Sequence, residues 1–222
     1  MADKKLEKAL YGPSTAEVAL GAGLGLLVGV VCACVYLVFK PVQPVKELPQ
    51  EPAVGTVYYL AGRSDGSKAR AWSSKLAAFT GGGSVVATEE ELNAWAGSLG
   101  GAKPGEKAPA SDAFLSASGL NFRIDGGRLQ IGQKVLLNYF GLSKEVQFQT
   151  AGGFVRQGDG VVFVPDTLHL GLCPLHVVPG AGGLLRKALL AQQKLPEDFR
   201  AAWAKVADLK VEDGLLKVTT QP

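Results

Sequence analysis

The chain has 222 residues, of which 47% are hydrophobic and 19% are charged, and its formal net charge at pH 7 is +3. So small a charge, without a cluster of basic residues, excludes the electrostatic footprint of a nucleic-acid-binding protein. Only one of the three cysteines, Cys173, lies outside the apolar N-terminal segment. We therefore expect packing, rather than an internal disulfide, to hold the fold together.

The N-terminus contains a long uninterrupted apolar segment. Residues 18–39 include no charged side chain, and as a helix they rise at about 1.5 Å per residue, enough to cross a bilayer core of roughly 30 Å. The competing interpretation is a secretory signal peptide, but its apolar core is about 7–15 residues long, and no small-residue cleavage site follows Phe39. We predict a tail at 1–17 and a retained transmembrane helix at 18–39.

Positive charges flank this segment unevenly. Lys4, Lys5 and Lys8 precede it, whereas Lys40 and Lys46 follow it. Because Lys and Arg concentrate on the cytoplasmic side of membrane helices, the N-terminus is expected inside. We predict a single-pass protein of the bacterial inner (cytoplasmic) membrane, with its C-terminal body in the periplasm.

Small residues recur every four positions along the apolar segment, at Gly21, Gly25, Gly29 and Ala33. They share one helix face, and small residues allow two membrane helices to approach closely. We expect helix–helix association, and hence a homodimer, through this face. The alternative is that these four residues reflect only the usual small-residue content of membrane helices.

The segment after the helix is rich in proline. Residues 40–55 contain four prolines at short intervals, a spacing typical of an extended, polyproline-like chain. We predict a linker that lifts the body, residues 56–222, away from the membrane.

Two helices are expected at the start of the body. The first covers 67–80 and is ended by three consecutive glycines. The second covers 89–99, where Thr88 and Glu91 have the spacing of a capping box. A loop rich in Gly, Pro and Ala follows at 100–112.

Alternating apolar and polar residues predict strands through the region 114–169. In 120–124, for example, Leu, Phe and Ile alternate with polar residues. Gly-rich segments at 125–127, 151–153 and 158–160 are expected to be the turns between strands. Short links favour an antiparallel meander.

The C-terminal part returns to helices and ends in a hairpin. We expect helices at 181–193 and from Pro196 to Val206, and then strands at 209–211 and 215–219 around Asp213-Gly214. The predicted fold class is α+β: one N-terminal transmembrane helix, then a curved antiparallel sheet packed with helices.

Two short sequences carry a family resemblance. They are TEEELNAW at 88–95 and LGLCPL at 170–175, the latter followed by a Gly/Pro break and an apolar helix. Both resemble segments of YpmS-like bacterial membrane-anchored proteins, and the order of elements is also similar to bacterial tubular lipid-binding-like domains. The resemblance implies an extracytoplasmic domain on one membrane helix that holds a lipid chain, and it implies no catalytic residues.

The sequence offers few groups for catalysis or metal binding. His169, Cys173 and His176 are good zinc ligand types, but a fourth ligand is not evident, and His176 has the opposite strand parity from the other two. Neither a nucleophile motif nor a nucleotide-binding glycine pattern is recognised. We predict no metal, no cofactor and no catalytic activity.

We expect the body to bind a lipid or another apolar ligand in a groove between sheet and helices. The groove residues we predict are Leu120, Phe122, Phe163, Leu184 and Leu189. The alternative function is a structural or interaction subunit of a cell-envelope membrane complex, whose strand edges recruit envelope proteins. An open apolar groove would favour the first function, and a filled core with an exposed strand edge would favour the second.

Overall fold

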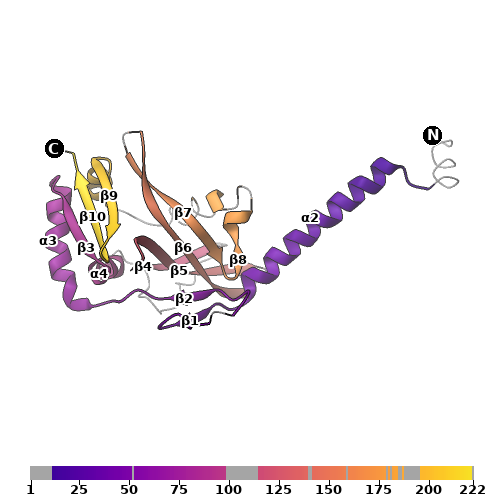
Figure 1. Cartoon of the computed structure of the whole chain (residues 1–222), viewed down its shortest axis with the longest axis horizontal. Helices are drawn as coiled ribbons and strands as arrows, with labels where there is room; N and C mark the ends of the chain where they lie inside the picture. The colour runs from indigo at the N-terminus through magenta and orange to yellow at the C-terminus, as the bar shows by residue number, and fades with distance from the viewer. Residues whose placement is uncertain are drawn as a thin grey trace.

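A computed structural model of the chain describes residues 12–51, 53–98, 115–139, 142–158, 160–178, 180, 182–184, 187 and 196–221 (Figure 1). In this part of the chain, one long helix projects from a body in which helices pack on antiparallel sheets. The predicted α+β class is therefore confirmed.

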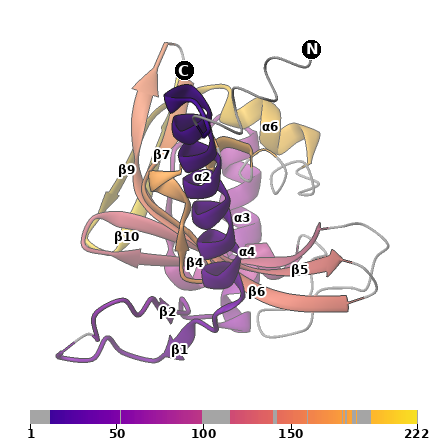
Figure 2. The ribbon, with the colours of Figure 1, turned by 90° about the vertical axis from the view of Figure 1, so that its right-hand side faces the viewer.

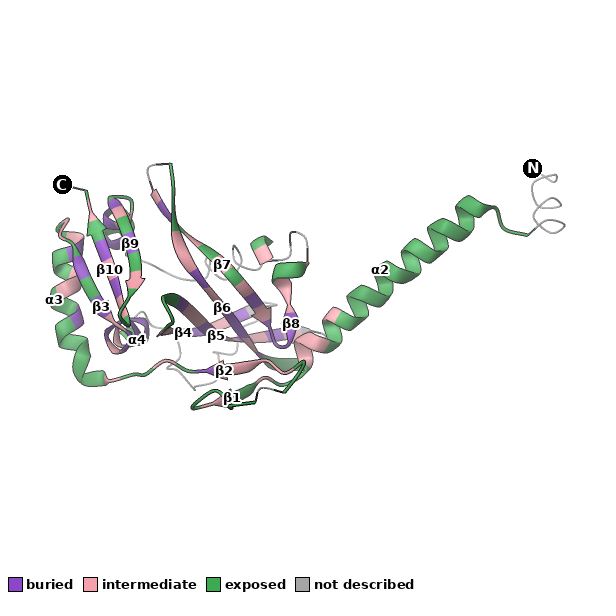
Figure 3. Ribbon diagram, viewed as in Figure 1, coloured by how far each residue is buried: buried purple, intermediate pink, exposed green. Residues whose placement is uncertain are grey.

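The projecting helix, α2 (Thr15–Phe39), is 25 residues long and is long and apolar enough to span a membrane. It begins three residues before the predicted span because Ser14 and Glu17 form a capping box. The Ser14 Oγ accepts a hydrogen bond from the Glu17 N–H at 3.3 Å, and the Ser14 N–H donates to the Glu17 carboxylate at 3.1 Å. Most of the helix surface is exposed (Figure 3).

The larger sheet is the predicted meander. Its strands follow chain order and are all antiparallel: β4 (Leu115–Asp125), β5 (Arg128–Tyr139), β6 (Leu142–Gln157), β7 (Gly160–Leu170) and β8 (Cys173–Pro174). The β4–β5 turn contains Gly126 and Gly127, both with positive φ, as its Asp-Gly-Gly sequence predicts.

The predicted turn at 151–153 is wrong, because these residues lie inside the 16-residue strand β6. The pairing of β6 with β7 shifts register between Ala151 and Gly152. A Cβ on Gly152 would lie 2.1 Å from the Val164 carbonyl oxygen. This glycine therefore permits the close approach of two strands at an irregular position, rather than a reversal of the chain.

A smaller sheet contains β3 (Val85–Thr88), β10 (Leu215–Thr220) and β9 (Val206–Glu212), in that order. The predicted C-terminal hairpin is confirmed as β9–β10, with Asp213 and Gly214 at positive φ. The pairing of β3 with β10 joins distant parts of the chain and was not predicted. Val206 opens β9 instead of extending the preceding helix.

Helices cover the smaller sheet and the inner face of the larger one. They are η1 (Gly66–Lys68), α3 (Ala69–Thr80), α4 (Glu89–Ser98) and α6 (Glu197–Trp203). In Figure 1, α3 and the smaller sheet lie at the end of the body opposite α2. The predicted loop at 100–112, and all but four residues of the predicted helix at 181–193, lie outside the described residues.

The predicted capping box at the start of α4 is confirmed. The Glu91 N–H donates to the Thr88 Oγ at 3.3 Å, and the Thr88 N–H donates to the Glu91 carboxylate at 2.9 Å. Burial disfavours ionised Glu91, but hydrogen bonds from Lys75 and Thr88 outweigh it and lower the pKa of this carboxyl group. Lys75 lies on α3, so the same carboxylate ties the two helices together.

Polar side chains of α4 close the free edge of β4. The Asn93 amide donates to the Phe122 carbonyl at 2.7 Å and accepts from the Phe122 N–H at 2.7 Å. The Glu89 carboxylate accepts from the Ile124 N–H at 2.8 Å. These side chains satisfy strand groups that would otherwise be buried without partners. Glu89 therefore not only lies in the first turn of α4 but also binds the edge of β4.

The described part of the proline-rich segment is not the extended spacer that we predicted. Within it, β1 (Gln43–Val45) pairs in parallel with β2 (Tyr58–Leu60), so the chain folds back along the body. In the segment between β1 and β2, the Ala53 N–H donates to the Tyr58 hydroxyl at 3.1 Å. The prolines are compatible with a two-stranded edge because such an edge needs few backbone donors.

The last turns of α2 pack directly on the larger sheet (Figures 1 and 2). The Leu172 N–H donates to the Leu37 carbonyl at 3.0 Å. Gly171 has φ +59°, and a Cβ there would lie 2.2 Å from the Val38 carbonyl oxygen. Glycine alone therefore fits this turn without strain.

Val38 and Phe39 complete a hydrophobic group that we name the anchor cluster. Its buried members are Val135, Leu137, Val146, Phe148, Leu168 and Leu170. Beside it, Cys34 of α2 contacts the fully buried Cys173. Burial, and then the Cys34 thiol, raise the pKa of Cys173 to about 11.

Candidate functional site

The body contains an apolar cavity of about 620 Å³. One wall is the inner face of the larger sheet, and the other is built from β3, β10, α3, α4 and α6. The volume falls within the range of about 300–1,000 Å³ that is usual for small-molecule sites. Nearly all of the lining side chains are aliphatic or aromatic.

Strand register explains how the sheet forms its wall. Phe122 on β4 is opposite Ile131 on β5, Ile131 is opposite Thr150 on β6, and Thr150 is opposite Leu168 on β7. Directly opposed residues share one face of a sheet, so this row points into the cavity. The next row along includes Leu120, opposite Gln133.

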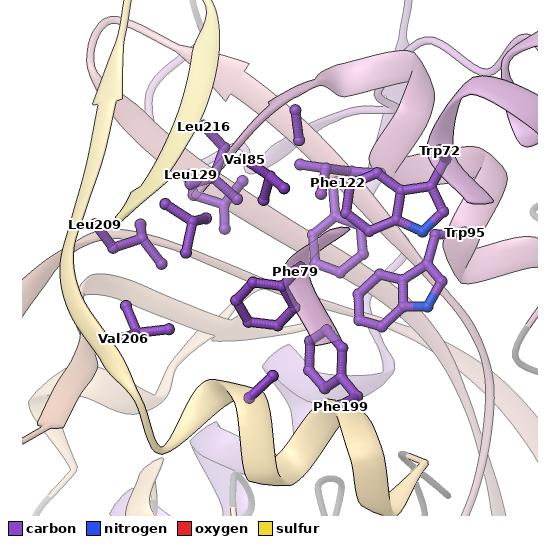
Figure 4. Packing of buried hydrophobic residues seen from close by; sticks show 14 of the residues in the cluster. Trp72, Phe79, Val85, Trp95, Phe122, Leu129, Phe199, Val206, Leu209 and Leu216 are labelled. Carbon is purple, nitrogen blue, oxygen red and sulfur yellow. The ribbon is translucent and has the colours of Figure 1, made fainter. Parts of the chain in front are cut away.

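Aromatic rings from three helices form much of the opposite wall (Figure 4). Trp72 of α3 and Trp95 of α4 have ring centroids 5.6 Å apart, and Trp95 lies 4.8 Å from Phe199 of α6. Phe79 of α3 lies 5.5 Å from Phe199. Their tilted geometry is favourable for aromatic pairs and holds the three helices together. The Nε1–H of Trp72 has no acceptor among the described residues.

Two uncharged polar side chains also line the cavity, and each donates one hydrogen bond to a backbone carbonyl. The Gln133 amide donates to the Ser118 carbonyl at 2.6 Å, and the Thr150 hydroxyl donates to the Thr167 carbonyl at 2.9 Å. Their side-chain oxygens remain as acceptors, and the second amide N–H of Gln133 remains as a donor. The third polar lining residue is Arg200 on α6.

The predicted groove residues are only partly brought together. Leu120, Phe122 and Phe163 line the same cavity. Leu184 is 74% exposed and is not part of the lining, whereas Leu189 lies outside the described residues.

Sequence reasoning missed most of the helical wall, including Phe199. Trp72, Trp95 and Trp203, which come from three predicted helices, also line the cavity. The apolar helix faces were the available signal, but they do not distinguish a cavity wall from a filled core.

The small residues of α2 lie along its exposed length. A Cβ on Gly21, Gly25 or Gly29 would meet nothing within 4 Å, and Ala33 is exposed. No described residue of the body covers this face. It is therefore accessible to a second helix, and the predicted association stays a prediction.

The candidate metal ligands do not assemble as a set. The His169 and His176 rings are 5.3 Å apart, but Cys173 faces Cys34, and the His176 Nδ1 lies 3.3 Å from both the N and O atoms of Leu168. Among the described residues, no group of three or more His, Cys, Asp or Glu could hold a metal ion. Burial, and then the neighbouring His176, lower the pKa of His169.

Comparison with protein-family models, curated proteins and solved structures finds no match for this chain. The resemblance to YpmS-like proteins is thus neither supported nor refuted, and the functional argument depends on the geometry of the cavity.

Proposed function

We propose that the body binds the acyl chain of a membrane lipid in this cavity, without catalysing a reaction. The observation that carries the proposal is the volume of about 620 Å³ lined almost entirely by apolar side chains. Each methylene transferred from water to such surroundings is worth about 0.8 kcal/mol, or about fourfold in affinity. A filled core would instead have favoured the alternative, a structural subunit of an envelope complex.

The position of the cavity supports a membrane lipid as the source of the chain. Phe148 and Leu168 line the cavity and also belong to the anchor cluster, against which Val38 and Phe39 of α2 pack. One end of the cavity therefore adjoins the segment proposed to enter the bilayer. A lipid leaving the membrane has only a short distance to travel before its chain is buried again.

The same contacts support a retained anchor rather than a cleaved signal sequence. Removing α2 would uncover the anchor cluster and leave the Leu172 N–H without the Leu37 carbonyl. With three lysines before the span and two soon after it, we place the body on the periplasmic side of the bacterial inner membrane.

Native mass spectrometry of the full chain, released from nanodiscs, tests the proposal. We expect a phospholipid or fatty acid to remain bound in defined stoichiometry. Leu120→Trp, which adds volume inside the cavity, should abolish retention. Leu142→Trp is the matched control because Leu142 is exposed at the end of β6 and does not line the cavity. Equal retention by the two variants, or none by the unmodified chain, would contradict the proposal.

A further inference from the structure

Among the described residues, Arg200 is the only charged one that lines the cavity. It follows the buried Phe199 on α6, and its own side chain is exposed, which places it at the mouth. In the part of the chain that the structure describes, no aspartate, glutamate or lysine contributes to the lining. The cavity therefore presents one positive charge and no negative charge to a ligand.

The guanidinium of Arg200 has no partner in the described part of the chain. Glu197 and Asp198 lie on the same short helix, yet neither forms an ion pair with it, and the Asp198 carboxylate accepts from the Phe199 N–H at 2.8 Å. A guanidinium offers five N–H donors in a planar fork that matches a carboxylate or a phosphate. An unpaired guanidinium at the mouth of an apolar cavity is thus suited to an anionic group.

The rest of the described lining offers an anion no positive charge. Gln133 and Thr150 are uncharged, and each already donates one hydrogen bond, to the carbonyls of Ser118 and Thr167. The donors that remain, the second Gln133 N–H and the Trp72 Nε1–H, are neutral, so an anion beside them would be buried without a countercharge, at a large cost in free energy. A ligand with one negative charge is stable only with that charge at Arg200 and its chain directed inward.

We propose that the ligand is an acyl amphiphile with an anionic head, a carboxylate or a phosphate, which binds the Arg200 guanidinium at the mouth. This inference rests on the proposed function, since it requires the chain to occupy the cavity. To the proposed function, this inference adds the chemical class of the ligand and its orientation in the cavity. Because α6 packs on α3, and α3 lies at the end of the body opposite α2 (Figure 1), the head lies at the end of the body remote from the anchor.

The three tryptophans of the chain all line the cavity, so their fluorescence reports its occupancy. The full chain in phosphatidylcholine nanodiscs is titrated with doxyl-stearate, whose nitroxide quenches tryptophan, and with the uncharged methyl ester of doxyl-stearate. We expect the acid to bind about tenfold more tightly than the ester. Arg200→Gln should remove this difference, because the acid then loses its charged partner and binds no more tightly than the ester.

Lys205→Gln is the matched control, because Lys205 is an exposed cation just beyond α6 that does not line the cavity. It should keep the preference for the acid. Equal binding of acid and ester, unaffected by Arg200→Gln, would overturn the inference while leaving the proposed function intact. Quenching by neither probe would refute the proposed function itself.

Competition then distinguishes the two anionic heads. Palmitate and lysophosphatidate are each used to displace doxyl-stearate, with hexadecanol as the uncharged competitor. Stronger displacement by either anion supports the inference and identifies the head as carboxylate or phosphate. Displacement by hexadecanol as strong as by both anions would overturn it.

Discussion

At the anchor cluster, Val135 has no exposed surface, and the backbone of α2 approaches Gly171 so closely that no Cβ would fit. Toward the opposite end of the body, aromatic rings from three helices form one wall of a cavity of about 620 Å³. Protein interiors are normally close-packed. This domain contains both a densely packed region, at the anchor cluster, and a loosely packed one, at the cavity. The dense end suits a fixed attachment to the anchor, and the cavity suits a replaceable ligand.

The largest expected effect is at the dense end. Gly171→Ala should destabilise the full chain by about 3 kcal/mol, because it adds positive-φ strain and a Cβ close to the Val38 carbonyl. Gly158→Ala is the matched control: its φ of +62° is nearly the same, but nothing lies within 4 Å of its Cβ position. It should cost only about 1 kcal/mol. Thermal unfolding in one detergent compares them, and equal losses would contradict a tight α2 contact.

A second pair of variants tests the difference in packing directly. Val135→Phe and Val161→Phe add the same volume to two buried valines, the first in the anchor cluster and the second in the cavity wall. Overpacking should cost about 1–3 kcal/mol at Val135, and less than about 1 kcal/mol at Val161, where the ring can enter the cavity. The same unfolding assay measures both. A larger loss at Val161 would mean that the cavity is closed to added volume.

Individual strands and helix starts at both ends of the body could be predicted from the sequence, because they depend on interactions between residues close together in the chain. Strand alternation predicted the meander, and Thr88 with Glu91 predicted the start of α4. The errors came from contacts between distant residues. Gly152 has turn composition but serves a close approach to Val164, and the prolines near β1 did not reveal the pairing of that strand with β2.

The candidate site was half predictable for the same reason. Leu120 and Phe122 were found because β4 alternates, and alternation identifies the inward face of a strand. No local pattern shows that the pairing of β3 with β10 holds the helical wall at a distance from the sheet. The cavity lies between two layers, the larger sheet and the helical wall. Its existence therefore could not be predicted before the spacing of these layers was known from the fold.

The anchor itself offers a smaller, separable effect. Beyond its docked turns α2 is exposed, and Gly25→Leu should weaken self-association by about 1 kcal/mol if the small-residue face packs against a second helix. Gly23→Leu makes the same change about 200° away around the helix and should have little effect. Energy transfer between labelled full chains in nanodiscs measures the difference. Equal effects of the two substitutions would argue against this face.

The smallest expected effect uses the fact that both histidines of the chain, His169 and His176, lie near the anchor end. Burial, and then His176, hold the pKa of His169 below the ordinary 6.5. Above pH 6.5 both the folded and unfolded states are neutral at this residue, so it adds no pH dependence there. As the pH falls below 6.5, the unfolded chain takes up a proton more readily than the folded one. Stability is therefore lost progressively until the pH passes the folded pKa.

We expect the melting temperature of the full chain to fall by about 2 °C or less from this residue between pH 7 and pH 5. His169→Gln should remove that part of the slope. Quenching of the cavity tryptophans by doxyl-stearate methyl ester should be unchanged over the same range, because no histidine lines the cavity. A parallel loss of ester binding in the unmodified chain, absent in His169→Gln, would show that the anchor end controls the cavity. The two ends would then have to be treated as one cooperative unit, in which loosening the dense packing around α2 also opens the ligand site.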